Sequence, residues 1–272
     1  MSNNLSKLNF VKINFVDKGT FYLKFFIFVS LTIFLIFLKT FLQSFIKSKS
    51  QKIIQIFHKL LLWLININVE IEGKSDLNNV PKLYVSNHLS YLDIPVLGSI
   101  LNGRFIAKNE ISNWPIFGYL SKVGNTIFIN RNLRFLKQNK SIIYDFISKG
   151  DSVILFPEGT TSDGIRVLKF KSSLLTSLEQ KNILIQPIVI NYTSINGMPL
   201  SRWLKPIIAW YGDMDIKPHL INVLKLFSIK AKITLLPTLN GKDFTNRKDM
   251  TYTLHHAIDK CYSNEFNNSL SN

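Results

Sequence analysis

The sequence is poor in cysteine and in several of the motifs that mark common enzyme classes. Cys261 is the only cysteine among 272 residues, so an internal disulfide framework and a zinc site built on cysteines are excluded. The chain also has no Gly-x-Ser-x-Gly elbow, no HExxH helix, no Gly-x-Gly-x-x-Gly turn and no P-loop. A covalent serine or cysteine mechanism and a zinc peptidase site are therefore unsupported.

Acidic residues are scarce at the start of the chain. Residues 1–69 hold nine lysines against one acid, Asp17, and the whole chain carries a net charge of +16. A basic protein can bind nucleic acid, anionic lipid or a phosphorylated substrate. Because these lysines flank apolar segments and no nucleic-acid module is recognisable, the sequence favours an anionic membrane surface and predicts no nucleic-acid partner.

One long apolar run lies in this basic segment. Residues 25–38 read FFIFVSLTIFLIFL without a charge, which makes about 21 Å of helix against about 30 Å for the hydrocarbon core. Snorkelling lysines on either side would extend the run to Phe21–Ile46. A second run, Ile53–Ile67, predicts an amphipathic helix. Together they predict a hairpin that lies in or dips into one leaflet, with one true span or a soluble docking helix as alternatives.

From residue 66 onward, short β-rich runs alternate with helical patterns. The alternation predicts an α/β fold with a largely parallel central sheet flanked by helices. The expected strands are Val69–Glu72, Leu83–Ser86, Arg104–Ala107, Thr126–Ile129, Ser152–Phe156, Ile183–Ile190, Ile207–Tyr211 and Lys230–Leu236. The expected helices are Tyr91–Leu101, Pro115–Val123, Leu133–Lys149, Leu168–Gln180, Pro218–Leu226 and Thr245–Tyr262. The predicted division is a membrane-associating segment (1–64), a catalytic domain (65–263) and a flexible tail (264–272).

Two polar motifs follow expected strands: residues 87–93 read NHLSYLD and residues 156–160 read FPEGT. Histidine is the side chain best suited to accept a proton near neutral pH. Asp93 can fix the tautomer of His88 if the residues between them form the first turn of a helix, with Ser90 as its N-cap. Without a nucleophile, the pair predicts direct attack, in which His88 deprotonates a substrate hydroxyl that attacks an acyl carbonyl. A histidine satisfied by the backbone is the alternative.

These motifs resemble the ordered blocks of a known family. NHLSYLD matches the NHx4D motif of glycerolipid acyltransferases, the 1-acylglycerol-3-phosphate acyltransferase family. Residues 124–131 (GNTIFINR), 156–162 (FPEGTTS) and 186–190 (QPIVI) are similar to the second, third and fourth blocks. The resemblance spans residues 65–240. It implies a single glycerolipid-acyltransferase-type α/β domain preceded by an N-terminal membrane-binding helical hairpin.

The resemblance also implies roles for the matching residues, with His88 as general base, Asp93 as its partner and no covalent acyl-enzyme. The implied substrate-binding residues are Arg131, Glu158, Gly159 and Thr160, with Lys108, Arg166 and Lys169 as secondary candidates. A planar guanidinium grips phosphate oxygens in a bidentate way, which suits Arg131. Glu158 is expected to accept the substrate hydroxyl or to orient a basic neighbour, while the Gly159 and Thr160 amides approach the ligand. Asn130 stands where the family often has an aspartate.

The activity that the resemblance implies is transfer of a fatty acyl group from acyl-CoA or acyl carrier protein to 1-acyl-sn-glycerol-3-phosphate, giving phosphatidic acid. Another lysolipid acceptor, such as lyso-ornithine lipid, is the second candidate, because residues 210–214 and His219 resemble bacterial members close to those enzymes. His219 itself is expected to be structural. A non-catalytic membrane-binding protein of the same fold is the alternative from another class. We expect no metal or organic cofactor, membrane lipids as partners, and a place on the cytoplasmic face of the cell membrane.

Overall fold

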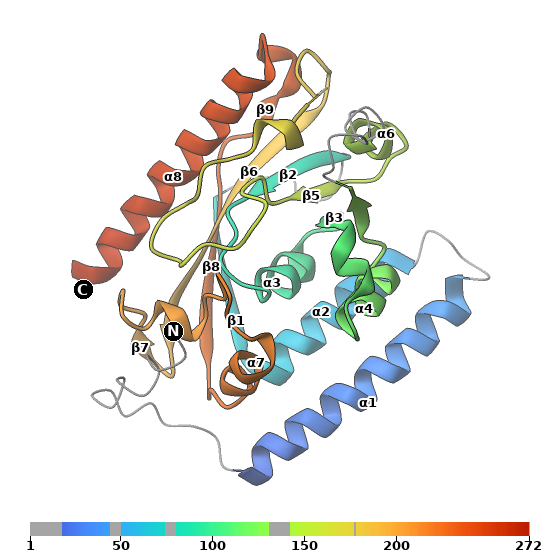
Figure 1. Ribbon diagram of the computed structural model, residues 1–272, viewed down its shortest axis with the longest axis vertical. Coiled ribbons are helices and arrows are strands. Elements are labelled where there is room, and N and C mark those ends of the chain that lie inside the picture. The colour runs from blue at the N-terminus through green and yellow to red at the C-terminus, as the bar shows by residue number, and fades with distance from the viewer. Residues whose placement is uncertain (1–17, 44–49, 74–79, 131–141, 177, 272) are drawn as a thin grey trace.

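The computed structural model describes residues 18–43, 50–73, 80–130, 142–176 and 178–271. Within these residues a nine-stranded sheet forms the centre of the molecule, with strand order β1-β8-β6-β2-β5-β3-β4 and with β7 and β9 paired to β6 (Figure 1). The strands are β1 Ile67–Glu72, β2 Lys82–Ser86, β3 Arg104–Lys108, β4 Ile127–Ile129, β5 Val153–Leu155, β6 Leu184–Ile195, β7 Met198–Pro199, β8 Ile229–Leu235 and β9 Leu239–Asn240.

The predicted largely parallel sheet is confirmed. Along the main path β1–β8, β6–β2, β2–β5, β5–β3 and β3–β4 are parallel, and β6–β8 is antiparallel. In this register Val85 of β2 lies beside Leu155 of β5 and Pro187 of β6. Parallel strands direct their carboxyl ends to one edge of a sheet, where ligand sites of α/β folds form. The segments that follow β2, β3, β4 and β5 therefore meet at this edge.

Helices cover both faces of the sheet. They are α1 Lys18–Gln43, α2 Ser50–Ile65, α3 Asp93–Ile100, α4 Phe117–Val123, α6 Ile142–Ser148, α7 Ile216–Leu224 and α8 Arg247–Ser271. The 3₁₀ turns are η3 Asn109–Asn113, η5 Ser172–Leu174, η6 Lys205–Ile207 and η7 Gly241–Asp243. Figure 1 shows α8 on one side of the strands and α3, backed by α2, on the other. The helical flanking expected from the alternating sequence pattern is therefore confirmed.

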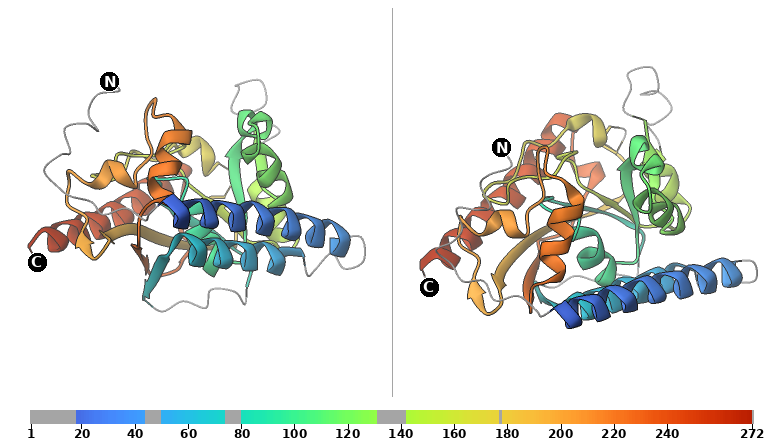
Figure 2. Two further views of the ribbon diagram at one scale, coloured as in Figure 1. Left: turned by 90° about the horizontal axis from the view of Figure 1, so that it is seen from below. Right: turned by 60° about the horizontal axis from the view of Figure 1, so that its bottom comes forward.

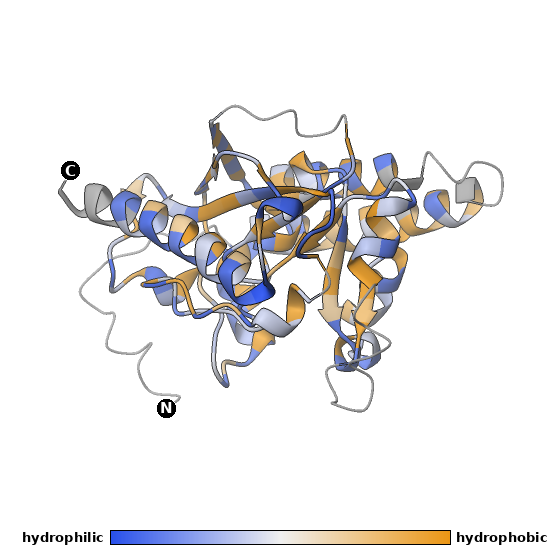
Figure 3. Ribbon diagram, turned by 90° about the horizontal axis from the view of Figure 1, so that it is seen from above, coloured by the Kyte–Doolittle hydropathy of each residue, from blue (hydrophilic) through white to orange (hydrophobic). Residues whose placement is uncertain are grey.

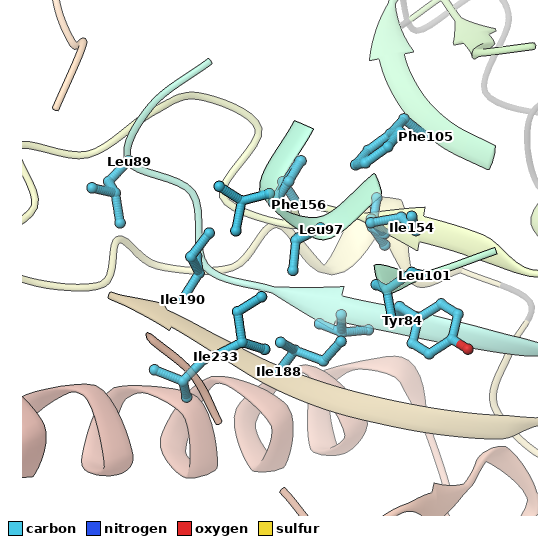
Figure 4. Packing of buried hydrophobic residues seen from close by; sticks show 14 of the residues in the cluster. Tyr84, Leu89, Leu97, Leu101, Phe105, Ile154, Phe156, Ile188, Ile190 and Ile233 are labelled. Carbon is cyan, nitrogen blue, oxygen red and sulfur yellow. The ribbon is translucent and has the colours of Figure 1, made fainter. Parts of the chain in front are cut away.

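The interior is built from the strands and from the helix faces turned toward them. Figure 3 shows mainly orange strands at the centre, whereas α8 alternates blue and orange along its length. Figure 4 shows Leu97 of α3 next to Phe156, which follows β5, and Ile188 and Ile233 on the side of α8. All four are buried. Burial on both faces explains why the parallel strands read as continuous apolar runs instead of alternating ones.

The N-terminal apolar helix expected from the sequence is present. Lys18–Phe41 is long and apolar enough to cross a membrane by length and composition, and aromatic side chains such as Phe26 and Phe37 are exposed along it. Figure 2 shows α1 running beside α2 along one side of the molecule. Lys39 of α1 donates to the carbonyl of Val123 at the end of α4. This bond links the apolar helix to the turn between α4 and β4.

The second helix, α2, is packed into the domain. Its side chains Ile54, Leu62 and Ile65 are buried. His58 lies against Gly98 of α3 so closely that a Cβ at position 98 would overlap its imidazole ring. The second half of the expected hairpin is thus held by the α/β domain, and the helix exposed along its length is α1.

Two expected elements are wrong. Leu168–Gln180 is not a helix within the described residues, where only Ser172–Leu174 forms a 3₁₀ turn, because the Leu168 amide donates to Glu158 and the Lys171 amide to the Pro157 carbonyl. Ile207–Tyr211 is not a strand. The amides of its first three residues close turns on the Leu204 and Lys205 carbonyls, and the Trp210 amide donates to Leu89. The expected helix 133–149 is described only from Ile142, and residues 133–141 lie outside the described part. α8 continues to Ser271, through most of the predicted tail.

Candidate active site

The two motifs predicted from the sequence meet at the carboxyl edge of the sheet. Val85 and Leu155 are register partners on parallel strands, and His88 and Glu158 each lie three residues beyond them. The main-chain N–H of His88 donates to Oε1 of Glu158 over 2.7 Å. The N–H of Ser162 in turn donates to the His88 carbonyl over 2.8 Å. Both main-chain groups of His88 are therefore fixed by the loop that follows β5.

Asn87 fixes the approach to the histidine from the other side. Its side-chain amide donates to the Ile190 carbonyl and accepts from the Ile190 N–H, both over 2.9 Å. Beyond the end of β2, these two side-chain bonds to the β6 backbone take the place of the main-chain bonds that pair β2 with β6. A buried amide with both ends satisfied sets a single orientation of the backbone. His88 therefore leaves the sheet in a defined direction.

His88 and Asp93 form the dyad that their spacing predicts. Nδ1 of His88 lies 2.7 Å from Oδ2 of Asp93, and the same oxygen accepts the N–H groups of Leu89 and Ser90 over 2.8 and 3.0 Å. The expected turn between the two residues is present. The helix begins at Asp93 instead of Tyr91, and Ser90 makes a local turn by accepting from the Leu92 N–H.

These contacts determine which ring nitrogen of His88 is free. Oδ2 of Asp93 accepts two main-chain N–H groups, so it is an acceptor toward the ring as well, and the proton of the neutral imidazole belongs on Nδ1. Nε2 then carries the lone pair. The His88 side chain is 16% exposed, whereas that of Asp93 is 0% exposed. A fixed imidazole with a buried carboxylate behind it and a free Nε2 can accept a proton from a hydroxyl.

An aromatic stack fixes the plane of the His88 ring. The Phe156 ring lies 3.9 Å from it between centroids, at an interplanar angle of 11°. Phe156 in turn stacks on Phe105 of β3 at 6.1 Å. The phenylalanine of FPEGT therefore positions the ring, a role that the sequence reasoning did not assign to it. The position of Phe156 directly after β5 is the sequence signal that would have indicated this stacking role.

Glu158 holds the loop instead of pointing outward. Its side chain is 1% exposed, and its second oxygen accepts the Leu168 N–H over 2.9 Å. Burial raises the pKa of Glu158 to about 8, with smaller contributions from Asp93 and Asp163, and against the lowering effect of the two amides. Since both oxygens accept main-chain amides, Glu158 joins the His88 segment to the loop around Leu168.

The remaining sequence candidates lie on the loops around the dyad. Gly159 has a φ of 71°, and its N–H closes a turn on the Phe156 carbonyl over 3.1 Å. Thr160 is exposed, and Arg166 and Lys169 are exposed on either side of the Leu168 position that Glu158 binds. Lys108 is exposed at the end of β3, next to β5.

Arg131 falls among residues 131–141, outside the described part of the chain, directly after Asn130 at the end of β4. His219 is buried and its Nδ1 lies 2.9 Å from the Tyr91 hydroxyl, in agreement with the structural role expected of it. Among the described residues no group of three or more histidine, cysteine, aspartate or glutamate side chains could hold a metal ion.

Tyr192 is a residue of the site that sequence reasoning missed. It lies on β6, is fully buried, and its hydroxyl donates to Oδ1 of Asp93 over 3.0 Å. The available signal was weak, because a tyrosine in an apolar strand reads as a core residue. Its position two residues beyond Ile190, the partner of Asn87, was the only hint.

Comparison with known proteins places this geometry in context. A family model described as Acyltransferase matches residues 68–191. The lyso-ornithine lipid O-acyltransferase of Rhizobium meliloti is 34% identical over 76% of this chain and 73% of its own length, and that of Brucella abortus is 33% identical over 74% and 78%. The 1-acyl-sn-glycerol-3-phosphate acyltransferase of Neisseria meningitidis is 29% identical over 79% of this chain and 80% of its own.

A solved structure shares the fold. The crystal structure of the 1-acyl-sn-glycerophosphate acyltransferase PlsC from Thermotoga maritima superposes with a TM-score of 0.62. It is 21% identical and covers 90% of this chain and 94% of its own. At that identity the likeness concerns the arrangement of sheet and helices.

Proposed function

Because the chain belongs to the acyltransferase family, we propose that it transfers a fatty acyl group from a thioester donor to the hydroxyl of a lysolipid at a membrane surface. The observation that carries the proposal is the dyad, in which Nδ1 of His88 is 2.7 Å from Oδ2 of Asp93 and Nε2 is left free. A base of this kind needs a hydroxyl to deprotonate, and a lysolipid supplies one.

In the proposed mechanism Nε2 of His88 removes the proton of the acceptor hydroxyl as its oxygen attacks the thioester carbonyl. Asp93 stabilises the imidazolium that forms. The tetrahedral intermediate collapses, the C–S bond breaks, and the imidazolium returns its proton to the departing thiolate. One C–O bond replaces one C–S bond, and no acyl-enzyme, metal or organic cofactor is required.

For the acceptor, we place lyso-ornithine lipid ahead of 1-acyl-sn-glycerol-3-phosphate. Two relatives so named are 33–34% identical over 74–76% of this chain. Two Neisseria enzymes named for the glycerophosphate are 25–29% identical over 79%, and that of Cocos nucifera is 33% identical over only 54%. This order reverses the one that the sequence motifs favour. The glycerophosphate stays the second candidate, because FPEGT and the arginine at position 131 match blocks of that family.

The proposed site of action is the cytoplasmic face of the cell membrane. The exposed apolar α1 and the lysines around it suit a bilayer with anionic headgroups, and both acceptor and product would be lipids. The proposed donor is acyl-CoA or acyl carrier protein.

An acyl-transfer assay of the membrane fraction tests the proposal. Lyso-ornithine lipid and 1-acyl-sn-glycerol-3-phosphate are offered in parallel, each with acyl-CoA and with acyl-loaded carrier protein, to wild type and to His88→Ala. We expect transfer to lyso-ornithine lipid that His88→Ala abolishes. Transfer to the glycerophosphate alone would make it the acceptor in place of lyso-ornithine lipid. Full activity of His88→Ala would show that His88 is not the general base.

Arg131→Ala gives a second test of the acceptor. If the acceptor carries a phosphate that Arg131 grips, the substitution raises the KM for the acceptor more than the KM for the donor. An equal effect on both KM values would argue against a phosphate contact at this residue.

A further inference from the structure

The buried carboxylate of Asp93 is bound on both of its oxygens. Oδ2 receives the His88 ring and two main-chain N–H groups, and Oδ1 receives the Tyr192 hydroxyl over 3.0 Å. The loop and ring contacts come from residues next to Asp93 in sequence, whereas Tyr192 comes from β6 on the other side of β2. The phenol is therefore the contact that ties the carboxylate to the sheet.

The hydroxyl of Tyr192 is held in its protonated, donating form. Burial is the main cause that raises the pKa of Tyr192 well above its usual value, and the charge of Asp93 beside it adds to the effect. The ring itself is fully buried, so the surrounding core holds it in a single orientation. A phenol that stays protonated beside a carboxylate makes a charge-assisted hydrogen bond, which is among the stronger kinds in proteins.

The backbone of β6 is irregular at this residue. The pairing of β6 with β8 shifts register between Tyr192 and Ser194, and such bulges re-aim side chains near active sites. The buried ammonium group of Lys205 donates to the Tyr192 carbonyl over 3.1 Å and to Oδ1 of Asn191 over 2.8 Å. Lys205 thus fixes the β6 backbone at the residue whose hydroxyl binds the Asp93 carboxylate.

We propose that Tyr192 is a positioning residue for the reaction, which sets the orientation of the Asp93 carboxylate and, through it, of the His88 ring. The inference rests on the proposed function, since it assigns Tyr192 to the same dyad. In the structure Tyr192 reaches the carboxylate and not the free Nε2 edge of the imidazole, so its effect on the reaction passes through Asp93.

A carboxylate that loses the Tyr192 donor can turn about its Cα–Cβ and Cβ–Cγ bonds, and the His88 ring then loses its single orientation. Productive proton transfer needs the base within hydrogen-bond reach of the hydroxyl, and a small misplacement lowers the rate of the chemical step. Binding of lipid and thioester does not involve this hydrogen bond. The expected signature is a lower kcat with unchanged KM values.

Tyr192→Phe keeps the ring and removes the hydroxyl. We expect kcat per folded molecule to fall about tenfold to a hundredfold, as for loss of one hydrogen bond to a charged group, with KM for both substrates within about twofold. Tyr262→Phe is the matched control, because Tyr262 is also buried and its hydroxyl donates to the Gly164 carbonyl and not to either side chain of the dyad. Its kcat per folded molecule should change by less than about twofold.

A double-mutant cycle separates positioning from general damage to the fold. In an Asp93→Asn background, adding Tyr192→Phe should change kcat by less than about twofold, because the group on which the phenol acts is already altered. An undiminished effect in that background overturns the inference. So does full kcat in Tyr192→Phe while His88→Ala is inactive, a result that leaves the proposed function intact. Activity in His88→Ala would instead refute the dyad itself.

A second variant covers the case in which Tyr192→Phe does not fold. Incorporation of 3-fluorotyrosine at position 192 keeps both the ring and the hydroxyl, so kcat should stay within about fivefold of wild type. A loss as large as that expected for Tyr192→Phe would show that the hydroxyl contact is not what matters, and the inference would fall.

Discussion

The N–H of His88 donates to Oε1 of Glu158 over 2.7 Å, so the carboxyl group of the FPEGT motif supports the backbone of the proposed base. The other oxygen of Glu158 accepts the Leu168 N–H over 2.9 Å. One buried side chain thus joins the segment after β2 to both ends of the loop that follows β5. The motif glutamate therefore fixes the backbone that carries the proposed base.

Glu158→Gln should weaken both the fold and the activity. A glutamine has one acceptor oxygen and one NH₂ group, so one of the two main-chain amides would face a donor. We expect a loss of about 1–3 kcal/mol in the free energy of unfolding and a lower kcat, measured by thermal unfolding and by the transfer assay. Glu110→Gln on the exposed turn η3 is the control. A variant with the melting temperature and kcat of wild type would contradict the role assigned to Glu158.

Asp93→Asn should reduce catalysis while the protein stays folded and membrane-bound. The amide of asparagine cannot accept on both sides, so the tautomer of His88 is no longer fixed. For a comparable change in a Ser-His-Asp triad the loss in kcat is about 10⁴-fold, and we expect about 10²- to 10⁴-fold here. Steady-state kinetics and flotation with liposomes measure the two properties. Equal losses of activity and of membrane binding would indicate unfolding instead.

The sequence predicts the sheet and the dyad well, for physical reasons. Apolar runs that exit into polar motifs mark parallel strands, and a five-residue spacing brings His88 and Asp93 together when a turn forms between them. Tyr192 could not be predicted, because its partner is set by the lateral order of strands β6 and β2. The main-chain contacts of Glu158 could not be predicted for a similar reason, since the His88 amide that it binds follows a different strand of the sheet. Local pattern does not reveal contacts made across the sheet.

Errors in the elements have the same origin. Residues 168–180 have a helical pattern, but the amides of Leu168 and Lys171 are bound by the loop that carries Glu158. Tertiary hydrogen bonds here override a local preference that is weak by comparison.

Deletion of residues 1–43 should release much of the protein from membranes. The deletion removes α1, whose large apolar side chains are exposed, and spares α2, which packs on α3. Each exposed aromatic residue lost removes apolar area that could enter the interface. Fractionation measures the partition, and thermal unfolding checks that the shortened protein is folded. Unchanged partition of a folded protein would show that the membrane contact lies elsewhere.

Gly98→Ala should loosen the contact between α2 and α3. A Cβ at this position would overlap the imidazole of His58, and overpacking of a core contact costs about 1–3 kcal/mol. Thermal unfolding measures the loss. His58→Ala provides room for the new methyl group, so the double variant should lose less stability than the sum of the two single losses. Strict additivity would argue that the two residues do not touch.

The stability of the protein should fall in mild acid because of His58. Burial lowers the pKa of His58 to about 4, and a bond with the Gly98 backbone raises it only in part. In the unfolded chain the pKa is near 6.5, so the unfolded state binds more protons between these values. The stabilisation is complete above the unfolded pKa and is lost progressively as the pH falls toward 4. At pH 5 the loss is about 2 kcal/mol.

The measurement compares the free energy of unfolding at pH 7 and pH 5 for wild type and for His58→Met, which fills the site without a titrating group. The difference between the two pH values should be smaller in His58→Met by about 2 kcal/mol, since every other titrating group is common to both proteins. His256→Ala, on the exposed side of α8, is the control and should keep the wild-type difference. An equal pH dependence in wild type and His58→Met would show that His58 is already accessible to protons in the folded state, and the close packing of α2 on α3 would then be wrong.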